Sequence, residues 1–205
     1  TWSSRSCSSR GGTTITDVRL VVHLSMAIGG PQPLALHRVS ADWGEAGSKA
    51  IGTEAGGAPA QTGDVTWDHT FFPGSFWTNK GGDFSATASG TAVIDNRVTW
   101  HAFESTPQMV ADVQSWLDDP ANDFGWVMIG DELQDASVKR LDSRDNPVVA
   151  YRPLLLINCG PAPVTYCTAK PGLSCGTPSI RADGTSSVSR TEGLVVSAAP
   201  ARSAK

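Results

Sequence analysis

The sequence predicts an all-β fold, an antiparallel β-sandwich of jelly-roll-like type with one capping helix near residues 106–117. Two observations support this prediction. Many short apolar runs are separated by clusters of Gly, Pro, Asn and Asp, which is the pattern of short strands joined by turns. A single segment has the apolar period of an amphipathic helix. With 205 residues, the chain is long enough for one such sandwich and a tail.

The first strand is expected at Thr14–Ser25, where Val18, Leu20, Val22 and Leu24 occupy alternate positions. Leu34–Val39 is expected to pair with it as an antiparallel neighbour. Phe124–Gly130 is apolar on both parities, which predicts a central strand covered on both faces. The remaining strands are expected at Val65–Trp67, Ala86–Ile94, Val98–Phe103, Val138–Asp142 and Tyr151–Ile157.

The helix is expected from Thr106 to Leu117 and to cover one end of the sandwich. Ser105 or Thr106 can cap it, Pro107 fits its first turn, and Asp118-Asp119-Pro120 ends it. Its apolar face consists of Met109, Val110, Val113, Trp116 and Leu117.

Composition divides the chain into three parts. Residues 1–12 are rich in Ser, Arg and Gly without periodicity, which predicts disorder. Residues 13–157 are expected to form the sandwich, and residues 158–205 a linker with a truncated second module. Within the sandwich, residues 40–64 form a long Gly-rich excursion, and loops of this length are usually functional or disordered.

Charge and hydropathy exclude two classes of partner. The net charge is −4 and the Lys and Arg residues are scattered, so the chain has no basic surface of the kind that binds nucleic acid. Its apolar runs are too short for membrane insertion. The chain begins at Thr1 and shows no signal peptide, so we expect an upstream segment to be missing.

The cysteines are concentrated near the C-terminus, where Cys159, Cys167 and Cys175 lie close together. The cluster lacks a CxxC pair and a nearby His, which disfavours a metal site. A short-loop disulfide between Cys167 and Cys175 is favoured in an exported protein. Cys159 and the distant Cys7 are left without an assigned partner.

No catalytic signature is visible, because the chain has no GxSxG, HExxH, Gly-rich phosphate loop or CxxC motif. His23, His37, His69 and His101 are dispersed, and those in strands, His23 and His37, are expected to be hydrogen-bonded structural residues. The carboxylates are too numerous for counting to single out a glycosidase-like pair. We therefore expect a protein that is not an enzyme.

Tryptophans in the long loops indicate a carbohydrate site instead. Trp43, Glu45, Trp67 and Trp77 lie in or beside these loops, and indole stacking with a nearby carboxylate is the chemistry that sugar binding needs. The alternative is that Trp43 and Trp67 anchor their loops on the sheet. Of the three indoles, Trp77 is expected to be the most exposed.

Calcium is a further candidate ligand, since oxygen-bearing side chains gather in two turns. The two sets, neither with EF-hand spacing, are Asp142, Asp145 and Asn146, and Asp131, Glu132 and Asp135. An exposed polar turn is the favoured interpretation of both, with no cofactor and structural calcium as the open alternative.

Several motifs, in order between about Gly11 and Ile157, resemble the DNRLRE (disaggregatase-related) domain family. They are Leu36–Val39 with Ala41–Glu45, Gly63–Trp67, Thr99-Trp100, Met109–Leu117, Asn122–Trp126, Arg140–Asp145 and Tyr151–Leu155. The resemblance implies a bacterial secreted or cell-surface β-sandwich, in some members a carbohydrate-binding module on polysaccharide-degrading proteins.

Two features depart from this family pattern. Family members usually begin earlier, so one or two N-terminal strands are expected to be absent. The tail at Thr165–Cys175 and Pro178–Gly184 resembles the opening of a Cys-containing repeat of planctomycete-like exported proteins. The chain is therefore expected to be a fragment of a longer surface protein.

Three functions follow from the sequence. The favoured one is a non-catalytic extracellular module that binds carbohydrate, with a polysaccharide or other domains of its parent protein as partners. The alternatives are an adhesin or spacer domain without a small ligand and, more weakly, a fragment of a polysaccharide-degrading enzyme.

Overall fold

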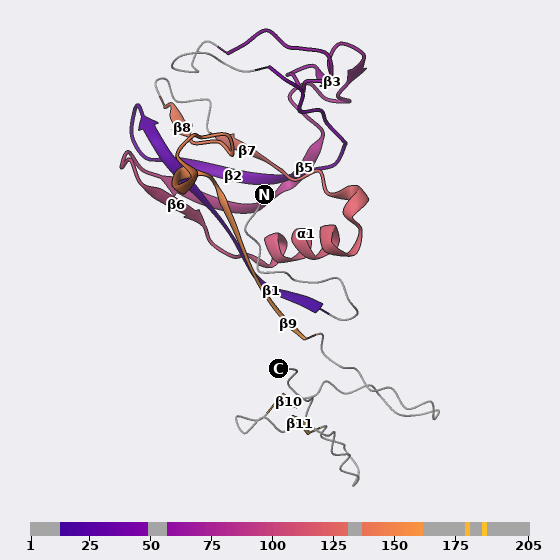
Figure 1. Cartoon of the computed structure of the whole chain (residues 1–205). Coiled ribbons are helices and arrows are strands. Elements are labelled where there is room, and N and C mark those ends of the chain that lie inside the picture. Colours follow the sequence, from indigo (N-terminus) through magenta and orange to yellow (C-terminus); the bar gives the residue numbers. More distant parts are fainter. Residues whose placement is uncertain (1–12, 49–56, 131–136, 162–178, 181–185, 188–205) are drawn as a thin grey trace. The chain divides into compact units, whose positions relative to one another are not determined.

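A computed structural model of the chain describes residues 13–48, 57–130, 137–161, 179–180 and 186–187. In this part of the chain, strands in antiparallel sheets predominate and a single α-helix is present, so the predicted all-β sandwich with one helix is confirmed (Figure 1). Contacts divide the chain into two units, of which the first contains Ile15–Cys159 and the second Gly160–Lys205. The described strands of the second unit, β10 (Ser179–Ile180) and β11 (Ser186–Ser187), pair antiparallel.

The first sheet is built around the long strand β1 (Thr13–Ala27), which has neighbours on both sides. One side pairs with β6 (Trp100–Phe103), with Leu20 opposite Phe103. The other partners are β8 (Lys139–Leu141), opposite Leu24–Ala27, and β9 (Leu154–Pro161). The even-numbered residues Val18, Val22 and Leu24 are buried, as their alternation predicts. Because β1 is paired on both sides, the expected lack of an upstream neighbour does not leave it at an edge.

The second sheet has the order β5-β2-β7, made of β5 (Phe84–Ile94), β2 (Gln32–Val39) and β7 (Trp126–Gly130). Two predictions are wrong here. β2 pairs with β5 and β7 and not with β1, because the chain crosses between the sheets after β1. β7 is an edge strand of this sheet in the described residues, and β2, whose Leu36 is buried, occupies the centre.

A small outlying sheet pairs β3 (His69–Phe71) with β4 (Ser75–Phe76) around a cis Phe72–Pro73 bond. The strand predicted at Val65–Trp67 is therefore wrong, because the strand begins further along and these residues belong to the loop before it. The structure also has two short 3-10 helices. The first, η1 (Pro120–Asn122), comes directly after the α-helix, and the second, η2 (Val149–Tyr151), comes directly before β9.

The α-helix α1 (Pro107–Asp118) begins where the sequence predicts, with the Thr106 hydroxyl accepting the Met109 N–H at 3.0 Å. Its buried face meets both sheets in one apolar core. The buried members of that core are Ile15, Val18, Val22, Leu36, Phe103, Met109, Val113 and Trp116.

A buried carboxylate joins the helix to the second sheet. Asp112 of α1 is fully buried, and its Oδ2 accepts hydrogen bonds from Ser89 Oγ at 2.5 Å and Trp126 Nε1 at 2.8 Å. Its Oδ1 accepts from Gln108 Nε2 at 2.9 Å and lies 3.8 Å from the Arg38 guanidinium. These donors compensate the burial of the charge and fix α1 against β2, β5 and β7.

Candidate functional site

The loops at one end of the second sheet are organised by a second buried carboxylate, Asp64. Its oxygens accept the backbone N–H of Gln61 at 2.6 Å and of Ala46 at 3.0 Å. These bonds, chiefly the one from Gln61, lower the pKa of Asp64 below its ordinary value. Asp64 therefore holds two segments of the loop region, residues 40–48 and 57–68, beside one another.

Close backbone packing completes this arrangement at Gly44. The Gly44 N–H donates to the Thr70 carbonyl at 2.9 Å, and its own carbonyl accepts from Val65 N–H at 2.8 Å. A Cβ on Gly44 would lie 1.8 Å from the Gly63 carbonyl oxygen and 2.7 Å from the Phe71 ring. Only glycine fits here, which explains one of the many glycines of this excursion.

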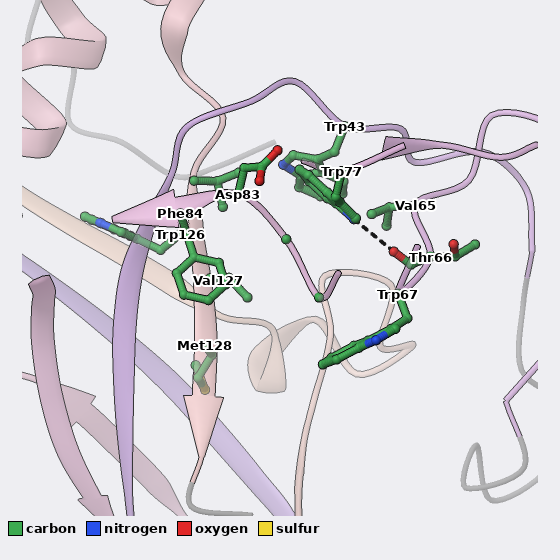
Figure 2. A pocket seen from close by; sticks show the side chains of 13 residues that line it. Trp43, Val65, Thr66, Trp67, Trp77, Asp83, Phe84, Trp126, Val127 and Met128 are labelled. Atoms are coloured by element: carbon green, nitrogen blue, oxygen red, sulfur yellow. Dashed lines mark hydrogen bonds between the residues drawn. The ribbon is translucent and has the colours of Figure 1, made fainter. Parts of the chain in front are cut away.

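These loops and the edge of the second sheet enclose a pocket of about 450 Å³, which we call the tryptophan pocket (Figure 2). Its walls are mainly aromatic and aliphatic. The residues that line it are Val39, Trp43, Val65, Thr66, Trp67, Trp77, Gly81, Gly82, Asp83, Phe84, Trp126, Val127 and Met128.

Hydrogen bonds fix the indoles of three of the four tryptophan residues at the pocket. Trp43 Nε1 donates to the Phe124 carbonyl at 2.9 Å. Trp77 Nε1 donates to the Thr66 carbonyl at 3.0 Å, the bond drawn as a dashed line in Figure 2. Trp126 Nε1 is bound by the buried Asp112. With their N–H groups used by the protein, the Trp43 and Trp77 indoles present carbon atoms to the pocket, and their orientation is set before any ligand arrives. The Trp126 ring packs against Trp116 on the core side of β7.

The fourth indole, Trp67, is 67% exposed, against 37% for Trp43. Its six-membered ring lies against Gly81, where an added Cβ would be 2.8 Å from the nearest ring carbon. The Gly81 N–H also donates to the Trp67 carbonyl at 2.7 Å. Gly81 therefore packs against the six-membered ring of Trp67, while a large part of the indole is exposed to solvent. The expectation that Trp77 is the most exposed of the three is wrong, because it is half-buried.

Asp83 is the single charged residue among those that line the pocket. Its Oδ2 accepts the Thr78 N–H at 2.8 Å, and its Oδ1 accepts from the backbone and side-chain amides of Asn79 at 2.9 and 3.1 Å. The Thr78 N–H is the main cause of a lowered pKa of Asp83. The pocket therefore contains a carboxylate that is ionised at neutral pH.

The structure brings together three of the four residues predicted for a sugar site. Trp43, Trp67 and Trp77 share the pocket, but Glu45 does not line it. Its Oε2 lies 2.9 Å from Arg144 Nη2, a partner distant in sequence. The loop-anchor alternative applies in part to Trp43, whose indole N–H fastens its loop to the residues before β7.

Sequence reasoning missed Asp83, Phe84, Trp126 and Met128 as pocket residues. Trp126 and Met128 lie in the run predicted to be a covered central strand, and both side chains do pack against the apolar core. Placing β7 at an edge leaves room for the pocket beside it. One signal in the sequence could have indicated Asp83 and Phe84 as pocket residues. The turn Gly81-Gly82-Asp83 follows the loop that contains Trp77 and directly precedes β5.

The histidines in strands are hydrogen-bonded, as predicted. Nδ1 of the buried His23 lies 2.7 Å from Asp142 Oδ2, and its ring stacks on Tyr151 with 4.2 Å between centroids. His37 Nδ1 lies 2.8 Å from the Ser85 carbonyl oxygen.

The calcium hypothesis gains no geometric support. Asp142 is engaged by His23, and Asn146 Oδ1 accepts the Val148 N–H within its own turn. The other set, residues 131–136, lies outside the described residues. Among the residues that the structure describes, no group of three or more His, Cys, Asp or Glu is placed to hold a metal ion. Calcium at either set stays a prediction.

Cys167 and Cys175, the predicted disulfide pair, also lie outside the described residues. Cys159, which was left without a predicted partner, lies in β9 and is not a free thiol. The disulfide therefore stays a prediction. Within the described part of the chain, no helix is long and apolar enough to cross a membrane.

Comparisons of the chain with protein-family models, with curated proteins and with solved structures found no match. The resemblance to DNRLRE domains therefore stays a prediction.

Proposed function

We propose that this domain is a non-catalytic carbohydrate-binding module whose ligand occupies the tryptophan pocket. The observation that carries the proposal is the convergence of Trp43, Trp67 and Trp77, from separate loop positions, on one cavity with a carboxylate. A pyranose ring has an apolar face of C–H groups that packs on an indole and a rim of hydroxyls that need acceptors.

The pocket supplies both requirements. Trp67 offers an exposed indole supported by Gly81, which is the platform that stacking needs. Asp83 accepts three hydrogen bonds from N–H groups and retains acceptor capacity, since a carboxylate has about four lone-pair sites. A volume of about 450 Å³ lies within the range of small-molecule sites. The setting we propose, from the sequence resemblance, is the surface or secreted part of a longer protein.

A spacer domain is the second candidate, and one observation favours it. The indole N–H groups of Trp43 and Trp77 bind backbone carbonyls, which is also how tryptophans fasten loops in a domain without a ligand. A hydrolase has less support from the pocket. Asp83 is the one carboxylate among the residues that line it, so the described walls hold no facing pair.

The test is a glycan-array screen followed by calorimetry on the best ligand, with wild-type protein and two variants. Trp67→Ala removes the exposed platform and should weaken binding about thirty-fold, as for a central aromatic residue in a binding site. Phe76→Ala is the matched control, because Phe76 is similarly exposed, at 65%, and does not line the pocket. Its affinity should equal that of the wild type.

Two results would contradict the proposal. If no glycan on the array binds, the spacer interpretation is favoured. If glycans bind but Trp67→Ala and wild type have the same affinity, the sugar site lies elsewhere.

A further inference from the structure

The charge of Asp83 has no cationic partner among the described residues. Among the described residues of this region, Lys80 and Arg144 are engaged by other carboxylates, Lys80 with Asp68 at 3.0 Å and Arg144 with Glu45 at 2.9 Å. Asp83 is instead held by neutral N–H donors of Thr78 and Asn79. Such donors stabilise the carboxylate but leave the pocket with a net negative charge.

The rest of the pocket wall suits a positive charge. Trp43, Trp67 and Trp77 line it (Figure 2), and the negative face of an indole attracts ammonium groups within about 6 Å of the ring. No Lys, Arg or His is among the lining residues, so no side chain there competes with a cationic ligand or attracts an anionic one. Aromatic walls around an uncompensated carboxylate are the chemistry that recognises alkylammonium groups.

We propose that the pocket selects a ligand that carries an ammonium group. Resting on the proposed carbohydrate function, this ligand is an amino sugar with a free amine, rather than its acetylated form or a uronic acid. The sugar ring stacks on Trp67, and its ammonium group lies between Asp83 and the indoles of Trp43 and Trp77 (Figure 2). A uronate places a carboxylate beside Asp83, where like charges repel.

The experiment compares probes that differ mainly in charge. Oligomers of glucosamine and of N-acetylglucosamine, equal in length and linkage, are titrated into the wild-type protein beside an oligogalacturonate and choline chloride. The glucosamine oligomer should bind about tenfold more tightly than the acetylated one, since cation–π attraction and a carboxylate contribute together. The oligogalacturonate should bind more weakly than either.

Asp83→Asn removes the charge with little change in shape and should bring the ratio of the two affinities close to one. Asp95→Asn is the matched control. Asp95 also caps its own turn by accepting an N–H, from Arg97 at 2.9 Å, but it lies outside the pocket, so its ratio should stay at the wild-type value. If Asp83→Asn does not fold, added salt replaces it, because screening should reduce the ratio in the wild type.

The outcomes separate this inference from the proposed function. Equal or tighter binding of the acetylated or uronate probe, abolished by Trp67→Ala, overturns the charge selection and leaves a sugar site. Trp67-dependent binding of choline without binding of any oligosaccharide supports the ammonium site and overturns the carbohydrate function. Binding of the glucosamine oligomer that Trp67→Ala leaves unchanged is non-specific attraction to an acidic protein and overturns the inference.

Discussion

The helix side of the sandwich and the loop end that forms the pocket are each organised by one buried carboxylate, in different ways. Asp112 lies in an apolar core and is satisfied by side chains of Ser89, Gln108 and Trp126. Asp64 lies among loops and is satisfied largely by backbone N–H groups of Ala46 and Gln61. The first carboxylate joins packed elements, whereas the second takes the place of regular secondary structure.

This difference indicates how each region keeps its shape. Around Asp112, burial of apolar side chains supplies most of the stabilisation, and the carboxylate fixes the geometry of elements that already pack. Around Asp64, few apolar groups are buried, so hydrogen bonds and close glycine packing determine the conformation. The loop end should therefore respond to small backbone changes and to acid before the sandwich does.

The largest effect is expected for Asp112→Ala. The change leaves the buried Ser89 hydroxyl and Trp126 N–H without their acceptor and should lower the free energy of unfolding by roughly 3 kcal/mol. Asp118→Ala, on the same helix but exposed and bonded to Gln114, should change it by less than about 0.5 kcal/mol. Urea unfolding followed by circular dichroism measures both. If the two variants lose the same free energy of unfolding, the hydrogen bonds of Asp112 contribute no stability beyond that of the surrounding apolar packing.

A smaller, local effect is expected for Gly44→Ala. The new methyl group would collide with the Gly63 carbonyl oxygen and the Phe71 ring, so the loops must separate, at a cost of roughly 1–3 kcal/mol. Gly74→Ala is the matched control in the same region, because a Cβ there meets nothing within 4 Å. Gly44→Ala should also weaken ligand binding, since Trp43 is its neighbour in the chain. Thermal unfolding and calorimetry that fail to distinguish the two variants would argue against tight packing at Gly44.

The sandwich could be predicted because its signals are local. Alternation in β1 and the Thr106 cap with Pro107 each depend on a few neighbouring residues, and both are confirmed. The pairing of β2 could not be read in the same way. A strand pattern shows which face is buried but not which sheet the strand joins, and here the chain crosses to the second sheet.

For the candidate site, the sequence pointed to Trp43, Trp67 and Trp77 as binding residues, but it did not reveal contacts between residues that are far apart in the chain. Val65–Trp67 has the composition of a strand, yet the Val65 N–H bonds to Gly44 and the segment remains a loop. Glu45 was a reasonable candidate until Arg144, about a hundred residues further along, proved to be its partner. Trp126 lies in a run predicted to be covered, and its ring does pack against Trp116 while Asp112 binds its N–H; that the same residue also borders the pocket depends on the edge position of β7.

The smallest effect concerns the response of the loop end to acid. The pKa values of Asp64 and Asp83 are lowered in the folded protein, by N–H donors from Gln61 and Thr78 respectively. A carboxyl group whose pKa is lower in the folded than in the unfolded state stabilises the fold fully above its unfolded pKa of about 4. That contribution decreases as the pH falls below this value and is lost once the pH passes the folded pKa.

As the pH falls below about 4, the loop end should therefore loosen while the sandwich stays folded. NMR spectra recorded along an acid titration can follow this directly. The amide signals of Gln61 and Ala46 should shift as Asp64 is protonated, at a pH at which the signals of β1 are unchanged. Asp64→Asn should abolish that shift, because its amide does not titrate in this range and at neutral pH it can accept with one oxygen only. If the amides of the loop end and of β1 instead lose their native signals at one common pH, in both wild type and variant, the two regions unfold together, and the loops depend on the sandwich rather than on Asp64.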